Sequence, residues 1–304
     1  MCRRSRDARI VSGGKVALSA PAKVNLALHV TGRRDDGYHL IDSIAIFTDL
    51  GDSVGIAPAD DLSLKVSGRF AAHAPGDESD LAWRAAEAFF LRTGLHGSAA
   101  ISIEKNIPAG AGLGGGSADA AAVLKGLNDL YGSPASAHEL DELGLTLGAD
   151  VPMCLAGRVL RASGVGEQIT PVIGWPALPI VLVWPGKPVS TAACFSALAR
   201  RDNAPLPCID RAETPAEVAL WLSECRNDLE SPALTLAPEI GHVLTRIKAN
   251  KDCLMARMSG SGSACFGLFP SAVAASIAAA ELESENFGWW VTPTLARCDQ
   301  RGRA

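Results

Sequence analysis

A glycine-rich segment gives the strongest chemical signal in the sequence. Residues 108–118 read Pro-Ala-Gly-Ala-Gly-Leu-Gly-Gly-Gly-Ser-Ala, and a helical apolar pattern follows at once. Glycines let backbone N–H groups approach a ligand without interference from Cβ atoms. A helix that begins after such a loop binds anions through its unsatisfied N–H groups and the positive end of its dipole. The segment therefore predicts a phosphate-binding loop, against the alternative of a flexible or tightly packed turn.

Two better-known phosphate loops fit the segment poorly. With Gly110 and Gly115 in the register of a Walker A loop, Gly116 occupies the position that requires lysine. The dinucleotide pattern G-x-G-x-x-G does match, but its acidic residue, expected about 20 positions further on, would fall near residues 129–131, inside the predicted helix. Both a P-loop NTPase and a dinucleotide-binding fold are therefore disfavoured.

Two other segments carry residue types suited to charge neutralisation and proton transfer. In Pro21-Ala-Lys-Val-Asn25, period-2 alternation places Lys23 and Asn25 on one face of a half-buried strand. Asp150 stands between a small-residue turn and Pro152, before an apolar stretch that reads as a strand. The alternatives are a solvent-facing Lys and Asn, and an aspartate that only caps a turn or helix.

The elements that must position these residues form a mixture of sheet and helix. Alternation predicts strands over residues 24–30, 38–47, 99–103, 180–184 and 264–269, and helical spacing predicts helices over 80–93, 117–130 and 138–147. Turns are expected at 32–37 and 259–263. The pattern predicts two α+β domains, residues 1–170 and 171–304, joined near the Pro/Gly-rich region 174–188.

Composition excludes several classes of protein. The chain has 304 residues, 48% of them hydrophobic and 20% charged, which excludes a mainly disordered protein. The formal net charge of −5 argues against a dedicated nucleic-acid binder. No apolar run approaches the roughly 18–20 residues that span a bilayer.

The cysteines and the N-terminal segment predict a cytoplasmic protein. The 8 cysteines form no C-x-x-C pair and no zinc-ligand spacing with histidine, so buried free thiols are expected. Four arginines near the start resemble the first part of an export signal, but Ser12, Gly13, Gly14 and Lys15 stand where its apolar stretch would be. A partly disordered N-terminal segment is therefore the favoured interpretation.

Taken together, the motifs resemble one family. P-A-K-V-N-L, G-Y-H, the glycine-rich segment, L-G-A-D-V-P and M-S-G-S-G-S-A-C-F occur in the order found in the GHMP kinase superfamily, and Asn227-Asp-Leu-Glu230 is similar to a further segment of it. These motifs run from residue 21 to residue 266 and so cover most of the chain. The glycine-rich loop alone indicates the superfamily, whereas the other motifs are more specific.

The resemblance implies a fold and an activity. The implied fold has an N-terminal ribosomal-protein-S5-like domain and a C-terminal α/β sandwich, with the active site in the cleft between them. The implied activity is ATP-dependent phosphorylation of the 2-hydroxyl of a cytidine diphosphate-linked methylerythritol, with Mg²⁺, in non-mevalonate isoprenoid biosynthesis. The implied enzyme is a monomer or a homodimer without nucleic-acid or membrane partners. The alternatives are a homoserine- or mevalonate-type kinase, which would lack the Tyr38–His39 pair, and a nucleotide-binding regulator without turnover.

The resemblance also implies roles for individual residues. Lys23 and Asp150 match the catalytic pair, with Asp150 as general base. Asn25, Tyr38 and His39 match residues that hold the acceptor, and Thr191 and Phe195 match further acceptor contacts more loosely. The ATP phosphate loop corresponds to Pro108, Ala109, Gly110, Ala111, Gly112, Leu113, Gly114, Gly115, Gly116, Ser117 and Ala118, of which Ser117 is the candidate Mg²⁺ ligand. Asp119 departs from the common Asn and is expected to face outward or to help hold the metal.

Overall fold

The computed structural model describes residues 9–11, 14–208, 211–285 and 287–296. The N-terminal Arg3, Arg4 and Arg6, and Cys2 and Cys298, lie outside these ranges. The chain forms two compact units, each assembled from separate stretches of sequence. Unit 1 comprises residues 1–22, 50–109 and 114–157, and unit 2 comprises residues 23–49, 110–113 and 158–304. The expected domain boundary at residues 170/171 stays a prediction.

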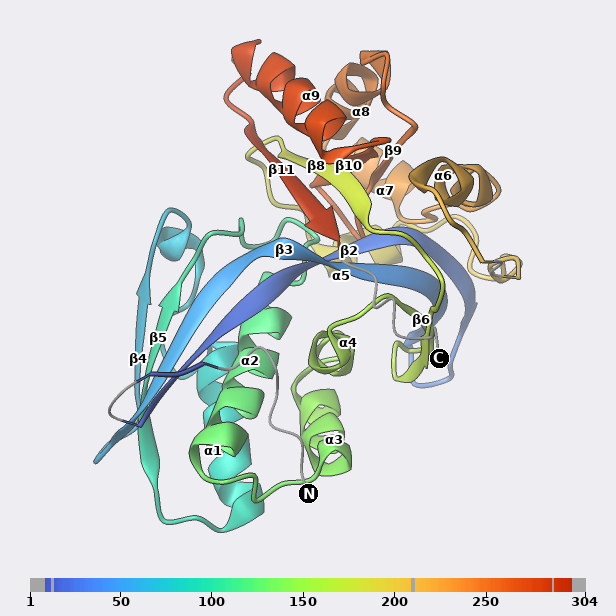
Figure 1. Ribbon diagram of the computed structural model, residues 1–304. Coiled ribbons are helices and arrows are strands. Elements are labelled where there is room, and N and C mark those ends of the chain that lie inside the picture. Colours follow the sequence, from blue (N-terminus) through green and yellow to red (C-terminus); the bar gives the residue numbers. More distant parts are fainter. Residues whose placement is uncertain (1–8, 12–13, 209–210, 286, 297–304) are drawn as a thin grey trace. The chain divides into compact units, whose positions relative to one another are not determined.

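Unit 1 contains a sheet with helices on one face (Figure 1). Its strands are β1 (Arg9–Val11), the start of β2 (Lys15–Arg33), the end of β3 (His39–Ala59), β4 (Ser63–Ser67) and β5 (Ser98–Glu104). β5 pairs antiparallel with β3, Val54 opposite Ile103, and parallel with β4. Alternate side chains of β5 are buried, as expected for a sheet covered on one side.

The helices of unit 1 begin and end where the sequence provides capping residues. They are the 3₁₀ turn η1 (Ala71–His73), α1 (Leu81–Thr93), α2 (Gly115–Leu130), α3 (Ala137–Leu147) and α4 (Val151–Ala156). The Asp80 side chain accepts a hydrogen bond from the N–H of Ala82 at the start of α1, and Gly94 ends this helix at φ 65°. Ser136 and Glu139 form a capping box at α3. The predicted helices are confirmed.

Unit 2 is built around a buried antiparallel sheet. Its strands are the remaining parts of β2 and β3, with β6 (Leu160–Gly164), β7 (Gln168–Pro171), β8 (Leu178–Trp184), β9 (Met255–Met258), β10 (Cys265–Leu268) and β11 (Trp290–Ala296). The order β3-β11-β8-β10-β9 puts β8 at the centre, and every residue of β8 is buried. The predicted strands over 180–184 and 264–269 correspond to β8 and β10.

The helices of unit 2 are shorter on average and pack around this sheet. They are α5 (Thr191–Ser196), α6 (Pro215–Ser223), α7 (Glu230–Leu236), α8 (Glu239–Ala249) and α9 (Ala272–Ser284). Val181, Val183, Ile240, Ile247 and Phe269 belong to one buried core of this unit. Loss of water from these apolar surfaces is the main stabilising contribution.

Two sequence expectations about local structure are wrong. β2 is buried at every position from 22 to 30, so Lys23 and Asn25 do not face solvent, and the strand is not half-buried. The stretch after Asp150 is the helix α4 instead of a strand, with Pro152 in its first turn. Proline fits there because the first helical N–H groups have no intrahelical partner.

The described cysteines are free thiols. Cys154, Cys194, Cys225 and Cys265 are buried, whereas Cys208 is exposed. Burial raises the pKa of the Cys225 thiol to about 11. None of the helices in the described ranges combines the length and apolar character that a membrane span requires.

Candidate active site

The glycine-rich loop leads directly into the N-terminus of α2. The helix begins at Gly115, two residues earlier than expected, so Gly115, Gly116 and Ser117 form its first turn. The cap residue Gly114 has φ 66°, and no side chain caps these amides. The first turn therefore presents N–H groups and the positive end of the helix dipole, as a phosphate site requires.

The preceding part of the loop is tightly packed within unit 2. Gly112 has φ 77°, and a Cβ atom there would lie 2.5 Å from the Ser259 carbonyl oxygen. The Ser259 hydroxyl donates to the Gly112 oxygen at 2.9 Å, and the Ala264 N–H donates to the Ala111 oxygen. Residues 110–113 are therefore held by the 259–264 turn, so this part is not a flexible spacer. A glycine is required at position 112 because the neighbouring backbone leaves no room for a Cβ atom, and not because a ligand must approach there.

Lys23 and Asn25 are anchored to the same turn and loop. The Lys23 N–H donates to the Leu113 oxygen at 2.9 Å, and the Asn25 N–H donates to Ser259 Oγ at 3.1 Å. The Asn25 side chain donates to Ser43 Oγ at 2.8 Å. Lys23 is only 4% exposed. Unit 2 thus brings together the predicted lysine, the predicted asparagine and part of the predicted loop.

Asp150 lies in unit 1, immediately before α4. It occupies the N-cap position, is partly buried, and its side chain makes no capping bond. The side chain of Asp150 therefore does not cap α4, which was the alternative role considered for it. Because Lys23 belongs to unit 2, the pairing of Lys23 with Asp150, and the cleft expected between domains, stay predictions.

A buried charge cluster in unit 1 was not anticipated from the sequence. Lys105 Nζ donates to Asp52 Oδ2 and, at 2.5 Å, to Asp119 Oδ2. Asp52 Oδ1 accepts from the backbone N–H groups of Asn106 and Ile107, at 2.5 and 2.9 Å. Burial lowers the pKa of Lys105, but the two carboxylates outweigh this effect and leave it above its ordinary value. Lys105 is therefore charged, and it connects the chain before the loop to the first turns of α2.

Asp119 does not face outward, so that expectation is wrong. It is 3% exposed and its Oδ2 atom accepts from Lys105, whereas the metal-binding role considered for it stays a prediction. Burial raises the pKa of Asp119 to about 7, with Asp52 adding to the rise and Lys105 opposing it. Its Oδ1 atom is buried without a hydrogen-bond partner.

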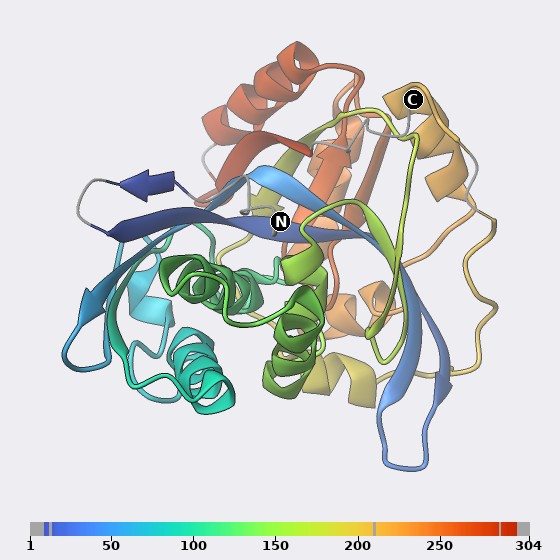
Figure 2. The same ribbon diagram turned by 60° about the horizontal axis from the view of Figure 1, so that its bottom comes forward.

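The predicted acceptor-binding residues gather in unit 2. The His39 and Phe195 rings stack with centroids 4.8 Å apart, and Tyr38 beside them is 64% exposed. Thr191 Oγ1 lies 2.8 Å from Ser261 Oγ. Burial lowers the pKa of His39, and the cations Arg33 and Arg201 lower it further. The turn that carries Tyr38 closes the β2–β3 ribbon, drawn in blue in Figure 2.

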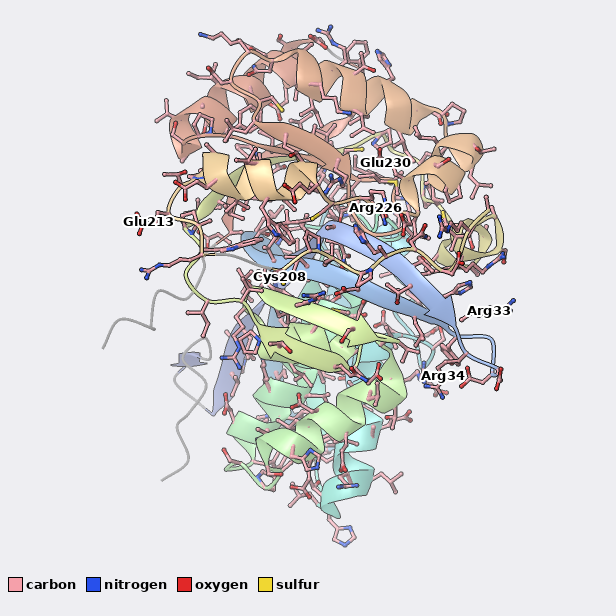
Figure 3. The ribbon with its side chains drawn as sticks, turned by 90° about the vertical axis from the view of Figure 1, so that its right-hand side faces the viewer. Arg33, Arg34, Cys208, Glu213, Arg226 and Glu230 are labelled. Carbon is pink, nitrogen blue, oxygen red and sulfur yellow. The ribbon has the colours of Figure 1, made fainter. Side chains whose placement is uncertain are left out.

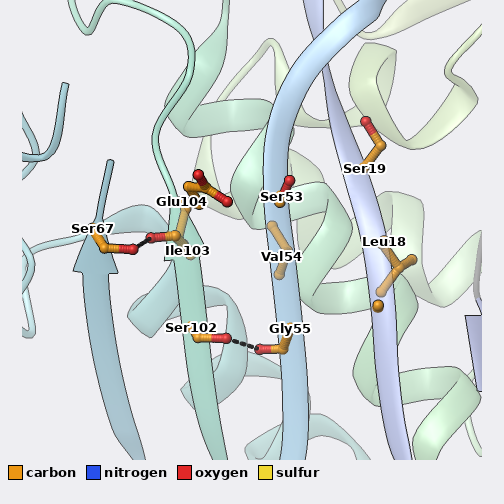
Figure 4. Close-up of a pocket in the computed structure, with 10 residues that line it drawn as sticks. Leu18, Ser19, Ser53, Val54, Gly55, Ser67, Ser102, Ile103 and Glu104 are labelled. Atoms are coloured by element: carbon orange, nitrogen blue, oxygen red, sulfur yellow. Dashed lines mark hydrogen bonds between the residues drawn. The ribbon is translucent and has the colours of Figure 1, made fainter. Parts of the chain in front are cut away.

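A hollow in unit 1 contains none of the predicted site residues. It has a volume of ≈ 610 Å³ and lies on the sheet face of unit 1 (Figure 4). Ser102 donates to the Gly55 oxygen at 3.3 Å, and Ser67 donates to the Ile103 oxygen at 3.4 Å. These hydroxyl groups therefore bond to backbone carbonyl oxygens of neighbouring strands. The hollow is not the candidate site.

Comparison with known proteins identifies the family. The family model described as GHMP kinases N terminal domain matches residues 80–158, and the one described as GHMP kinases C terminal matches residues 210–288. The 4-diphosphocytidyl-2-C-methyl-D-erythritol kinase of Mesorhizobium japonicum is 50% identical over 90% of this chain and 94% of its own length. The same enzyme of Dinoroseobacter shibae is 46% identical over 96% and 98%. The chain belongs to the 4-diphosphocytidyl-2-C-methyl-D-erythritol kinases. It is an ATP-dependent GHMP kinase.

Solved structures confirm the fold of this kinase family. A crystal structure of 4-(cytidine 5'-diphospho)-2C-methyl-D-erythritol kinase, 38% identical, superimposes with a TM-score of 0.76 over 92% of this chain and 99% of that one. Homoserine kinase from Cytophaga hutchinsonii, 18% identical over 96% of this chain and 97% of its own, gives 0.69. The second likeness shows the fold alone. The expected two-domain GHMP kinase fold of the α+β class is thereby confirmed.

Several residues that shape the site were missed in the sequence. Ser259 and Ser261 lie in a motif that carried the resemblance, but no role was assigned to them. Lys105 stands three residues before the loop, where a cation beside an apolar strand could have indicated a buried pair. Arg33 and Arg201 each belong to a pair of consecutive arginines, and sequence gives no means of separating the members of such a pair.

Proposed function

We propose that this kinase transfers the γ-phosphoryl group of ATP to the 2-hydroxyl of 4-diphosphocytidyl-2-C-methyl-D-erythritol, giving the 2-phosphate and ADP. The observation that carries the proposal is the glycine-rich loop, which is fixed to Lys23 at Leu113 and leads into the open first turn of α2. Phosphoryl transfer depends mainly on positioning and on stabilisation of charge. A rigid loop and an amide-lined helix end provide both.

The first turn of α2 supplies the donor site of this proposal. Its N–H groups would hold the β- and γ-phosphates of ATP. Ser117 has a partly exposed hydroxyl, a hard oxygen ligand of the kind that Mg²⁺ accepts together with phosphate oxygens and water. Ser117 would hold the ion, which when bound neutralises phosphate charge.

Asp150 and Lys23 supply the proposed acid–base chemistry. The carboxylate of Asp150 would accept the proton of the acceptor hydroxyl as that hydroxyl attacks. Lys23 would keep Asp150 ionised and stabilise the transferred phosphoryl group. A buried lysine carries a large effect because the surrounding medium screens its charge weakly.

The acceptor would be recognised by unit 2. Tyr38 is exposed and could stack on the cytosine ring, next to the His39–Phe195 stack. His39 and Asn25 would read polar groups of the acceptor, and Thr191 is a further contact. The lowered pKa of His39 keeps its ring neutral at pH 7, so one ring nitrogen can accept a hydrogen bond.

An ADP-release assay with Mg-ATP tests this proposal. The cytidyl acceptor, homoserine and mevalonate are compared as substrates, and we expect turnover with the first alone. Asp150→Asn should lower kcat by about 10²–10⁴-fold, the usual contribution of a general base, while ATP binding measured by calorimetry is retained. Asp61→Asn, which makes the same change at an exposed position of unit 1, is the matched control.

Each contrary result points to a different error. Near-normal turnover of Asp150→Asn would remove the general-base assignment. No turnover of the cytidyl acceptor, with ATP still bound, would favour another small-alcohol kinase or a regulatory protein. Loss of ATP binding itself would contradict the phosphate-loop assignment.

A reducing, cytoplasmic setting belongs to the same proposal. It is supported by the buried free thiols of Cys194, Cys225 and Cys265. The protein is expected to be a monomer or a homodimer. Light scattering of the purified protein distinguishes the two states.

A further inference from the structure

The segment of residues 227–230 has no role in the proposed function, although it begins with a buried asparagine of unit 2. Its backbone lies against β2, the strand that carries the predicted lysine and asparagine of the site. The Leu28 N–H donates to the Arg226 oxygen at 2.9 Å, and the Asp228 N–H donates to the Leu28 oxygen at 2.8 Å. Figure 3 shows Arg226 and Glu230, on either side of this stretch of chain. The segment is therefore fixed to β2.

The side chain of Asn227 reaches the turn that holds the glycine-rich loop. Its Nδ2 atom donates to the Met258 oxygen at 2.9 Å and to the Gly260 oxygen at 2.8 Å. Its Oδ1 atom accepts from the Leu229 N–H at 3.0 Å. Both protons of the amide group are thus used, on the two carbonyl groups that precede and follow Ser259. A carboxylate of the same shape could not donate these bonds.

Ser259 joins two parts of the predicted site within unit 2. Its Oγ atom accepts from the Asn25 N–H at 3.1 Å and donates to the Gly112 oxygen at 2.9 Å. Gly260 packs against the same two residues, since a Cβ atom there would lie 3.2 Å from Asn25 Oδ1 and 3.4 Å from the Gly112 oxygen. Any displacement of this turn therefore moves Asn25 and the loop relative to each other.

The composition of the turn gives it little stiffness of its own. Residues 258–263 read Met-Ser-Gly-Ser-Gly-Ser, and Gly260 and Gly262 have φ values of 55° and 84°. Glycine has the largest conformational freedom to lose on folding, so a turn of this kind depends on bonds from neighbouring segments. Asn227 supplies two such bonds from a segment that is fixed to β2.

We propose that Asn227 is a positioning residue of this kinase, which acts through Ser259 to hold Asn25 and residues 110–113 in place for phosphoryl transfer. A misplacement of about 1 Å can cost about 100-fold in rate. The effect is therefore expected on kcat, because the bonds of Asn227 go to the protein itself and leave substrate contacts in place. The catalytic part of this role rests on the proposed function, whereas the restraint of the loop does not.

Hydrogen exchange of the whole protein, measured by mass spectrometry without substrates, tests the restraint. We expect Asn227→Ala to raise the exchange rates of amides in residues 110–113 and 258–264 by about tenfold, because two buried bonds are lost. Asp228→Ala is the matched control. That carboxylate belongs to the same segment, but it bonds to Val30, Asn203 and Arg226. It should change exchange in these two stretches by less than about twofold.

The kinase assay tests the effect on the reaction. Asn227→Ala should lower kcat by about 10- to 100-fold, while the KM values of ATP and the acceptor change by less than about threefold. Asp228→Ala should keep its kcat within about twofold at a temperature where circular dichroism shows both variants folded. Asn227→Asp retains the shape and the acceptor for Leu229 but loses both donors. It should lower kcat as Asn227→Ala does, and it replaces that variant if alanine prevents folding.

A double-mutant cycle tests the connection through Ser259. Ser259→Ala removes the hydroxyl group that joins Asn25 to Gly112, so it should lower kcat by itself. Adding Asn227→Ala should then lower kcat by less than about threefold more, because the connection is already broken. Losses that multiply in the double variant would show that Asn227 acts by another route, and would overturn the proposal.

The outcomes separate this role from the proposed function. Unchanged exchange of residues 110–113 in Asn227→Ala would overturn the role, whatever the enzyme phosphorylates. Raised exchange with a normal kcat would overturn it as well. Equal rises in Asn227→Ala and Asp228→Ala would indicate a general loosening of unit 2 and have the same consequence. If the unaltered protein turns over no cytidyl acceptor, the proposed function fails. The exchange measurement then decides by itself whether Asn227 holds the loop.

Discussion

The charge cluster of unit 1 and the arginines of unit 2 place similar groups in opposite circumstances. Lys105 is 3% exposed and lies against the carboxylates of Asp52 and Asp119, and Asp52 also accepts hydrogen bonds from backbone N–H groups. Arg33 and Arg201 have no acidic partner among the described residues, and their nearest contacts are backbone carbonyl oxygens. The first set of charges is neutralised by neighbouring carboxylates, whereas the second set has no carboxylate partner within the described ranges.

This difference separates a charge cluster that holds the chain from cations that the described carboxylates leave uncompensated. A buried ion is tolerated only with a partner of opposite charge, because its desolvation is costly. Lys105 joins Asp119 on α2 to Asp52, which fixes the backbone at Asn106 and Ile107. The cluster therefore fixes both ends of the phosphate loop. Removing one of its members should therefore lower the free energy of unfolding.

Lys105→Met is the substitution with the largest expected effect on stability. Methionine fills a similar volume, but it leaves the carboxylates of Asp52 and Asp119 buried without their cation. Breaking a buried ion pair from one side costs about 3–5 kcal/mol. Urea denaturation should therefore show a loss of that size in the free energy of unfolding. Lys65→Met, at an exposed position of β4 in the same unit, should change it by less than about 0.5 kcal/mol. Equal effects of the two substitutions would abolish the distinction drawn between the clusters.

Asp119→Asn should cost much less, although it alters the same cluster. The raised pKa of Asp119 shows that the folded protein disfavours its ionised form on balance. Asparagine removes a negative charge from a cluster with two carboxylates and one cation, and its carbonyl oxygen can still accept from Lys105. We expect the free energy of unfolding to change by less than about 1 kcal/mol at neutral pH. A loss as large as that of Lys105→Met would mean that the ionised Asp119 is the principal partner of the lysine.

Local signals made most of the fold predictable from sequence. Asp80 and Gly94 mark the ends of α1, and alternation identifies β5, because capping and pleat periodicity depend on neighbouring residues. The burial of β2 on both faces was not predictable, since what covers a strand depends on distant segments. The Leu28 N–H, for example, donates to the Arg226 oxygen. The apolar stretch after Asp150 was too short for periodicity to separate a helix from a strand.

The candidate site was predictable only where its residues lie in motifs. The glycine-rich loop, Lys23, Asn25 and His39 could be selected in advance, and unit 2 brings His39 onto Phe195 across more than 150 positions of sequence. The partners that give charged residues their roles could not be predicted from the sequence. Asp119 reads as a surface aspartate until Lys105 is found against it, and Arg201 resembles Arg200 until Asp202 is found against only one of them.

The smallest expected effect provides the most direct comparison of the paired and unpaired arginines. Arg33 and Arg201 lower the pKa of His39 from its ordinary value of 6.5, so removing either cation must raise it. NMR titration of the imidazole should show a rise of its pKa in Arg201→Gln and in Arg33→Gln, without full recovery, because burial is the larger cause and remains. Arg34→Gln and Arg200→Gln should leave the pKa of His39 nearly unchanged, since Asp36 and Asp202 already neutralise those cations. Salt should diminish the rise by screening it. A larger rise in Arg200→Gln than in Arg201→Gln would show that the uncompensated charge lies elsewhere, and would remove the basis for contrasting the two regions.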